Sequence, residues 1–253
     1  MKTAILLVAY GSSNPGSRAG LAYFENLCRQ RFPGLPLRWA YSSALLRQRL
    51  AGARQKSDSV EKAIMRLHFE NFKAVAIQPL HTIQGREHEA VIHVARKTAY
   101  NVSLKCTIGS PLLTDSNSIS IMAKALLNVL PAERKQDEDV IFMGHGAKHI
   151  ASAAYEALDT EISRNDAHIH VASMSGPILL DHILARLSSQ KVWLFPLLSV
   201  VGRHVLHDMA GNQSNSWKMR IEAKGHKCIA VLQGMAQWDS ICNLWLNSLA
   251  NIL

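Results

Sequence analysis

The sequence predicts an α/β protein made of two similar halves, each with a parallel sheet covered by helices. Apolar runs of strand length alternate with longer segments of helical period, which is typical of parallel strands joined by helices. Two loops repeat one pattern, and a charged, turn-rich stretch at residues 131–139 separates the two series. We therefore expect an N-terminal half at residues 1–131 and a C-terminal half at residues 132–253.

The apolar periodicity places the elements in each half. Residues Val60, Ala63, Ile64 and Leu67 have helical spacing, and the helix that starts at Glu87 has carboxylates in its first turn, where the helix dipole favours them. The predicted strands are 3–10, 37–42, 73–80, 102–108, 139–144, 168–174, 191–198 and 227–232. The predicted helices are 17–31, 59–71, 87–99, 115–130, 150–163, 177–188, 203–210, 214–224 and 237–252.

Length and composition indicate a globular protein of the cytoplasm. The chain has 253 residues, 48% of them apolar, and no run approaches the ~18 apolar residues of a membrane span. The apolar N-terminus is short and runs into a turn without a clear cleavage site, so we interpret it as a buried strand rather than a signal peptide. The four cysteines are scattered, which favours reduced, packed thiols over a zinc site or a disulfide framework.

The net charge of +9 indicates an acidic partner. Such a partner can be nucleic acid, an anionic lipid or a polycarboxylate small molecule. The positive charge is spread along the chain, and the sequence contains no zinc finger, RNP-type aromatic motif or basic helix, which disfavours nucleic acid.

Two loops resemble copies of each other. Pro79–Glu87 and Pro196–His204 both follow an apolar run, and the spacing from Pro-Leu to Gly-Arg is identical. A second repeated pattern relates residues 9–12 to residues 144–147, which also lie at the ends of apolar runs. Because ligands of parallel sheets bind beyond the carboxyl ends of the strands, we expect His145, His204 and Glu87 to converge on one cleft that can hold a metal.

The histidines differ in how strongly the sequence supports a functional role. His145 lies between two glycines at a strand end, which leaves its imidazole uncovered; the alternative is a turn histidine with a structural hydrogen bond. His204 and His207 share a face if they are helical, and the alternative is a solvated face. The repeated loop pattern, in which His204 takes the position of Glu87, favours His204 over His207. His81 follows Pro-Leu directly and is expected to reach the same cleft.

Further residues of the echoed loops are candidates for substrate binding. The loop after the first strand can offer backbone N–H groups to a carboxylate or phosphate. Arg86 and Arg203 precede Glu87 and His204, where a guanidinium can grip a carboxylate at the cleft mouth. The candidates from the first loop are Tyr10, Gly11, Ser12 and Ser13.

Several familiar motifs are absent from the sequence. The stretch from His88 to His93 is one residue too long for the zinc-protease motif HExxH. Neither GxxxxGK[ST] nor GxGxxG occurs, so a nucleotide cofactor has no support. GxSxG is also absent, which leaves serine-based hydrolysis without support.

A resemblance to known proteins is carried by residues 6–13, 76–81, 140–147, 208–209 and 216–220. In these stretches the chain resembles the sirohydrochlorin cobaltochelatases of the anaerobic cobalamin pathway, which are class II tetrapyrrole chelatases. The resemblance implies two flavodoxin-like halves with a tetrapyrrole cleft between them. It also implies that His145 and His204 face the metal and that Glu87 is the carboxylate after the Gly-Arg turn. The metal is then a substrate, with Co²⁺ favoured over Fe²⁺ or Ni²⁺, and the protein can also self-associate.

Two departures from the family pattern leave alternatives open. Members of the family carry a carboxylate at the end of the second strand of the C-terminal half, where this chain has Met174. The residue before the second histidine is typically acidic and is Arg203 here. Because a thioether is softer than a carboxylate, these changes allow a non-catalytic tetrapyrrole or metal carrier as the alternative. A third interpretation is an α/β enzyme that acts on another small molecule.

Overall fold

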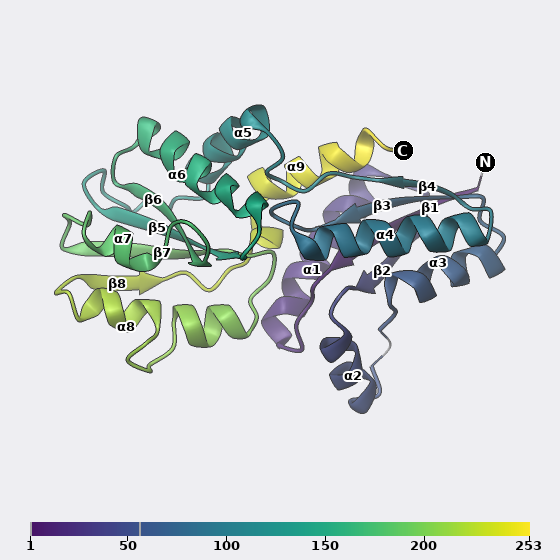
Figure 1. The fold of residues 1–253 in the computed structure, drawn as a ribbon, viewed down its shortest axis with the longest axis horizontal. Helices are drawn as coiled ribbons and strands as arrows, with labels where there is room; N and C mark the ends of the chain where they lie inside the picture. Colours follow the sequence, from purple (N-terminus) through teal and green to yellow (C-terminus); the bar gives the residue numbers. More distant parts are fainter. Residues whose placement is uncertain (1, 56) are drawn as a thin grey trace.

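The computed structural model describes residues 2–55 and 57–253 and contains two four-stranded parallel sheets (Figure 1). The strand order is β2-β1-β3-β4 in the first sheet and β6-β5-β7-β8 in the second, so the same topology occurs twice. This order matches the beginning of the flavodoxin order and confirms the predicted fold class. The strands are β1 (Thr3–Ala9), β2 (Leu37–Tyr41), β3 (Ala74–Pro79), β4 (Lys105–Ile108), β5 (Asp139–Gly146), β6 (Ile169–Ser175), β7 (Lys191–Leu197) and β8 (Lys227–Ala230).

The helices overlap the predicted segments but differ from them in several places. The segment predicted at 177–188 is helical only at Leu180–Leu184, and the one predicted at 150–163 begins with a 3-10 turn. One helix, α2, was not predicted, since only Leu46 and Leu50 of its nine residues are buried. The segment at 204–209 is a π-helix, η2, a form that often occurs at functional sites. The helices are α1 (Pro15–Arg31), α2 (Ala44–Gly52), α3 (Val60–Phe69), α4 (Arg86–Asn101), α5 (Ser116–Leu127), η1 (Ile150–Ser152), α6 (Ala153–Asn165), α7 (Leu180–Leu184), η2 (His204–Met209), α8 (Trp217–Glu222), η3 (Met235–Gln237) and α9 (Asp239–Ala250).

Helices cover both faces of each sheet. Apolar side chains of α3 and α4 pack on one face of the first sheet, and those of α7, η2 and α8 pack on one face of the second. The remaining faces share a single core, which extends from Ile5 and Leu7 of β1 to Phe142 of β5 and Trp193 of β7. The two sheets are therefore parts of one packed unit.

The last helix crosses from the second half to the first. In Figure 1, α9 lies beside β3 and β4 although it follows β8 in the chain. The ring of Trp245 meets Phe24 of α1 edge-on at 5.7 Å, and the Ser248 hydroxyl accepts a hydrogen bond from the Ser110 backbone. The division at residue 131 stays a prediction. The packing shows that the core of the first sheet also uses residues from the end of the chain.

The carboxyl ends of the two sheets face each other across the seam between the halves (Figure 1). There the Ser17 hydroxyl of α1 donates a hydrogen bond to the carbonyl of Val201. Gly202 lies so close to Ser12 that an added Cβ would be 3.5 Å from the serine Oγ. The loops that follow β1 and β7 therefore touch.

Two glycines shape the end of β5. An added Cβ at Gly144 would lie 2.4 Å from the ring of Tyr155, so the ring takes the space that a side chain would need. Gly146 has φ of 67°, and an added Cβ there would lie 1.6 Å from the carbonyl oxygen of Ser175. Glycine is therefore required on both sides of His145.

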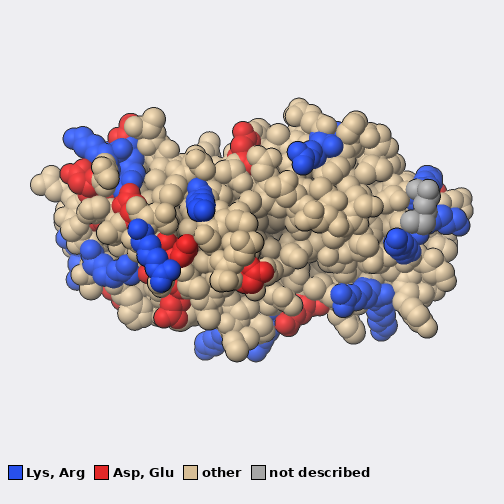
Figure 2. All heavy atoms as spheres, turned by 90° about the horizontal axis from the view of Figure 1, so that it is seen from above, with Lys and Arg blue, Asp and Glu red and all other residues tan. Residues whose placement is uncertain are grey.

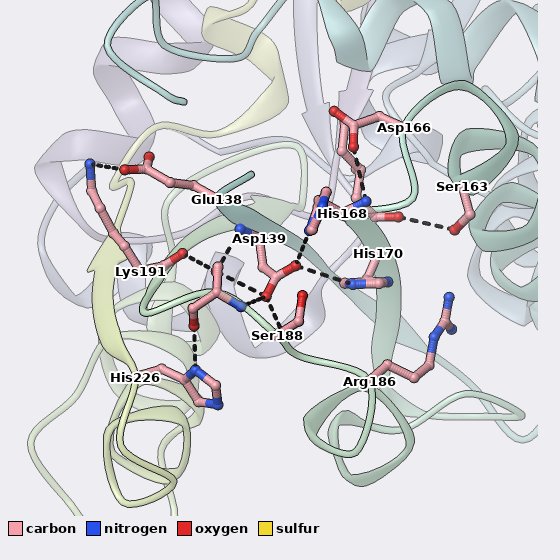
Figure 3. A network of polar contacts seen from close by, with 12 residues as sticks. Glu138, Asp139, Ser163, Asp166, His168, His170, Arg186, Ser188, Lys191 and His226 are labelled. Carbon is pink, nitrogen blue, oxygen red and sulfur yellow. Dashed lines mark hydrogen bonds and ion pairs between the residues drawn. The ribbon is translucent and has the colours of Figure 1, made fainter. Parts of the chain in front are cut away.

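A network of hydrogen bonds and ion pairs lies at the amino ends of the strands of the second sheet, opposite to His145 (Figure 3). The buried carboxylate of Asp139 accepts hydrogen bonds from the backbone of Ser188 and Ser189 and from His168. Burial raises the pKa of Asp139, but these hydrogen bonds outweigh burial and hold it below its usual value. His170 lies beside this carboxylate, and neither of its ring nitrogens has a hydrogen-bond partner among the described residues.

Charge is distributed without one dominant patch on the face seen in Figure 2. Charged side chains gather toward both ends of that face, and its middle is mostly uncharged. Among the described residues, no helix is long and apolar enough to span a bilayer.

We expect the His170→Leu substitution to flatten the pH dependence of stability. Burial, and then the charge of Arg186, lower the pKa of His170, so the folded state resists protonation while the unfolded histidine gains a proton below about pH 6.5. Stability is therefore lost as pH falls through that value, by at most ~1.4 kcal/mol per pH unit. Urea unfolding at pH 8 and pH 5.5 measures the effect. A wild-type pH dependence in the variant would contradict it.

We expect Gly146→Ala to destabilise the protein more than Gly34→Ala. Both glycines have positive φ, which costs alanine roughly 1–2 kcal/mol, but an added Cβ at Gly34 meets nothing within 4 Å. At Gly146 the clash with Ser175 adds a further ~1–3 kcal/mol. Chemical denaturation of the two variants gives the comparison, and equal losses would mean that the strand end relaxes freely.

Candidate metal site

The structure brings His145 and His204 together at the carboxyl edge of the second sheet. Their ring centroids are 5.0 Å apart and their planes are inclined by 75°. His145 lies on the same face of β5 as Ile141 and Met143, whose side chains enter the core beneath η2. Because His204 begins η2, the strand and the helix present the two imidazoles at the same end of one face.

Each of these histidines has its Nδ1 atom occupied. The Nδ1 of His145 lies 2.7 Å from the carbonyl oxygen of Gly146, and the Nδ1 of His204 lies 2.6 Å from a carboxylate oxygen of Asp208. Both partners are acceptors, so each Nδ1 carries the proton when the ring is neutral. The lone pair is then on Nε2 of both rings, as a metal ligand requires.

Glu87 adds a carboxylate from the first half. It occupies the first turn of α4, and its Oε1 accepts a hydrogen bond from the hydroxyl of Ser42, which follows β2. Desolvation raises the pKa of Glu87, while the Ser42 hydrogen bond and the charge of His145 oppose this rise. A carboxyl group with a raised pKa is a better proton acceptor than an ordinary one.

His81 is placed differently from the histidine pair. Its Nδ1 lies 3.1 Å from the Nδ1 of His88 on α4, and its buried Nε2 has no hydrogen-bond partner among the described residues. Burial, and then His88, lower the pKa of His81 to about 3, so this ring is neutral at physiological pH. Through its contact with His88, the residue after Glu87, His81 lies beside the first turn of α4.

The loop after β1 lies at the same edge. Tyr10 exposes half of its side chain, Gly11 has φ of 80°, and Ser13 is exposed. The Ser12 hydroxyl accepts a hydrogen bond from the backbone of Asn14, whose side chain in turn caps α1.

The remaining candidates lie near strand ends and at the starts of helices. Arg86 is the first residue of α4 and Arg203 directly precedes η2, and both are exposed. Met174 follows Ser173 on β6, next to the end of β5 in the register, and its partly buried side chain packs on the core beneath η2. His207 is also exposed, one turn beyond His204.

The sequence reasoning missed several residues of this site. Asp208 was noted only as part of a family motif, although its i,i+4 spacing from His204 is a usable signal. Ser42 follows a weakly predicted strand. Tyr155 is buried, its pKa is raised to about 12, and it hydrogen-bonds to Thr82 and to the Gly146 backbone. A contact between residues so distant in sequence leaves no local pattern.

The site is open rather than a closed metal cage. Within residues 2–55 and 57–253, no group of three or more His, Cys, Asp or Glu side chains is arranged to hold a metal ion. A structural zinc site, by contrast, closes four ligands around the ion. Two imidazoles with a carboxylate nearby suit a metal that binds and then leaves.

Known proteins resemble the chain over nearly its whole length. A sequence model of the family described as cobalt chelatase (CbiK) matches residues 3–253. The sirohydrochlorin cobaltochelatase CbiKC of Nitratidesulfovibrio vulgaris is 46% identical over 98% of this chain and 89% of its own length. The sirohydrochlorin cobaltochelatase of Salmonella typhimurium is 31% identical over 95% of this chain and 92% of its own.

Solved chelatases share the fold. SirB from Bacillus subtilis with Fe³⁺ superposes with a TM-score of 0.67 at 14% identity, over 99% of this chain and 95% of that one. CbiX, described as the terminal enzyme of siroheme biosynthesis in denitrifying bacteria, gives 0.63 at 14% identity over 99% of both chains. Taken with the sequence matches, these likenesses confirm the predicted resemblance: the chain belongs to the cobalt chelatase (CbiK) family.

Proposed function

We propose that the protein inserts a divalent metal, Co²⁺ in the first place, into sirohydrochlorin. The observation that carries this proposal is the pair His145 and His204, with rings 5.0 Å apart and Nδ1 of each already hydrogen-bonded. The 46% identity to a sirohydrochlorin cobaltochelatase supports the substrate. Imidazole ligands suit Co²⁺ as well as Fe²⁺ and Ni²⁺, which we regard as possible alternative metals.

The chemistry of insertion fits these side chains. The macrocycle must lose two pyrrole N–H protons, and the metal must exchange its water ligands for ring nitrogens. In the proposed mechanism, Nε2 of His145 and of His204 hold the metal over the ring. Glu87, whose pKa is raised, accepts one of the two protons on the side of the first half, and the other passes to solvent water.

One observation supports a second candidate function. Met174 and Arg203 provide no negative charge beside the histidine pair, and Met174 packs partly into the core. A protein with this site can bind a metallated tetrapyrrole as a carrier without inserting the metal. Tight binding without insertion would select this function, and a gain of turnover in Met174→Glu would show that a carboxylate was missing.

The proposal places the protein in the cytoplasm, with a tetrapyrrole rather than nucleic acid or a membrane as its partner. The four cysteines are free, as expected in a reducing compartment. The net charge of +9 complements the eight carboxylates of sirohydrochlorin.

A metallation assay tests the proposal directly. Purified protein mixed with sirohydrochlorin and Co²⁺ is expected to accelerate the absorbance change of metal insertion. Failure to exceed the uncatalysed rate with both Co²⁺ and Fe²⁺ would overturn it.

We expect His145→Ala and His204→Ala to abolish insertion and to weaken Co²⁺ binding by at least about tenfold, because each removes a ligand. His207→Ala is the matched control, since His207 lies outside the ring pair. Neither loss should be accompanied by unfolding, because His145 is exposed and His204 is only partly buried. Metal titration and circular dichroism provide the readouts. Equal weakening in His204→Ala and His207→Ala would mean that these two histidines act together.

We expect Arg86→Gln and Arg203→Gln to raise KM for the tetrapyrrole roughly fivefold each, as for the loss of ~1 kcal/mol from an exposed charge pair. The salt dependence of KM should flatten, since such pairs are screened over about 8 Å at physiological ionic strength. Arg164→Gln removes the same charge from α6, where Arg164 pairs with Glu161, and is the control. An unchanged KM in both variants would mean that these arginines face solvent and do not contact the tetrapyrrole.

A further inference from the structure

We propose that Asp208 is a positioning residue that fixes the ring of His204 with Nε2 directed at the incoming metal. The proposal rests on the proposed function, because it assigns a role within the same site. It goes beyond the ligand pair itself, since Asp208 acts through His204.

The contact is short and directional. Oδ2 of Asp208 lies 2.6 Å from Nδ1 of His204, within the range of charge-assisted hydrogen bonds. The carboxylate can only accept, so it selects the tautomer in which Nδ1 carries the proton and Nε2 the lone pair. A free imidazole has no such constraint.

The backbone holds Asp208 in place. Both residues of the pair belong to η2, whose buried side chains Val205 and Met209 anchor the helix in the core of the second half. The Ala210 amide donates to the carbonyl of Val205, five residues earlier, which is the hydrogen bond of a π-helix. The ring of His204 therefore has its hydrogen-bond partner on the same anchored helix, although both side chains are more than 40% exposed.

The arrangement differs from an ordinary helical ion pair. Lys218 and Glu222 on α8 also have i,i+4 spacing, but their charged atoms are 4.0 Å apart and touch no functional group. His204 faces the ring of His145, whose Nδ1 is likewise bound to an acceptor. Support of Nδ1 in both rings is what a site needs to present two Nε2 atoms.

The two supports differ in charge. A neutral carbonyl supports His145, whereas a carboxylate supports His204. A carboxylate behind the ring raises the basicity of the opposite nitrogen, so His204 becomes the stronger metal donor of the pair.

Three substitutions separate positioning from a surface ion pair. Asp208→Ala removes both the acceptor and the charge, Asp208→Asn keeps an acceptor, and Asp208→Glu keeps the charge. We expect the Kd for Co²⁺ to rise roughly 10–100-fold in Asp208→Ala and less in Asp208→Asn, with substantial recovery in Asp208→Glu. KM for sirohydrochlorin should stay unchanged. Glu222→Gln removes an equivalent helical charge and should leave both values at wild type.

A second measurement needs neither metal nor tetrapyrrole. In ¹⁵N NMR spectra of the metal-free protein, His204 should carry its proton on Nδ1, and Asp208→Ala should shift the population toward Nε2–H. An unchanged tautomer, or an unchanged Kd for Co²⁺ in Asp208→Ala, would overturn the proposal. If the wild type shows the Nδ1–H tautomer and binds Co²⁺ without inserting it, the chelatase function fails while the role of Asp208 stands.

Discussion

The backbone of Gly146 is the point on which the site depends. Its carbonyl oxygen accepts the hydrogen bond that orients His145, and its N–H donates to the hydroxyl of Tyr155, whose other partner is Thr82 of the first half. The backbone has this direction because Gly146 has φ of 67°, which a side chain would block against Ser175. One residue thus links the orientation of a proposed metal ligand to the seam between the halves.

The rest of the site follows from having two sheets with facing carboxyl edges. One edge provides His145 and His204, and the other provides Glu87, so the proposed ligands and the proposed proton acceptor come from opposite sides. Such a division suits a reaction in which a flat macrocycle exchanges protons for a metal. An incomplete ligand set also has a thermodynamic advantage: an ion held by few donors can be transferred to the ring, whereas a fourfold cage would retain it.

Local patterns in the sequence were sufficient for the fold and for part of the site. Apolar runs located every strand, and the repeated Pro-Leu to Gly-Arg spacing selected Glu87 and His204, because equivalent loops follow equivalent strands. The helix α2 was not predicted because it buries only Leu46 and Leu50, so its sequence has little apolar periodicity. The position of Tyr155 in the site was not predicted for another reason. Its hydrogen-bond partners, Thr82 and Gly146, are 73 and 9 residues away in sequence, so no local pattern indicates them.

The crossing of α9 has a consequence for how the chain acquires its structure during synthesis. The strands β1 and β3 leave the ribosome early, but Trp245, Leu246 and Leu249 of α9 belong to the same core as Ile5 and Leu7. Until α9 emerges, that face of the first sheet lacks part of its apolar cover, although α1 and α5 already contribute to the same core. The first sheet therefore completes its packing only after the strands of the second half have been made, and until then part of its apolar surface is exposed to aggregation.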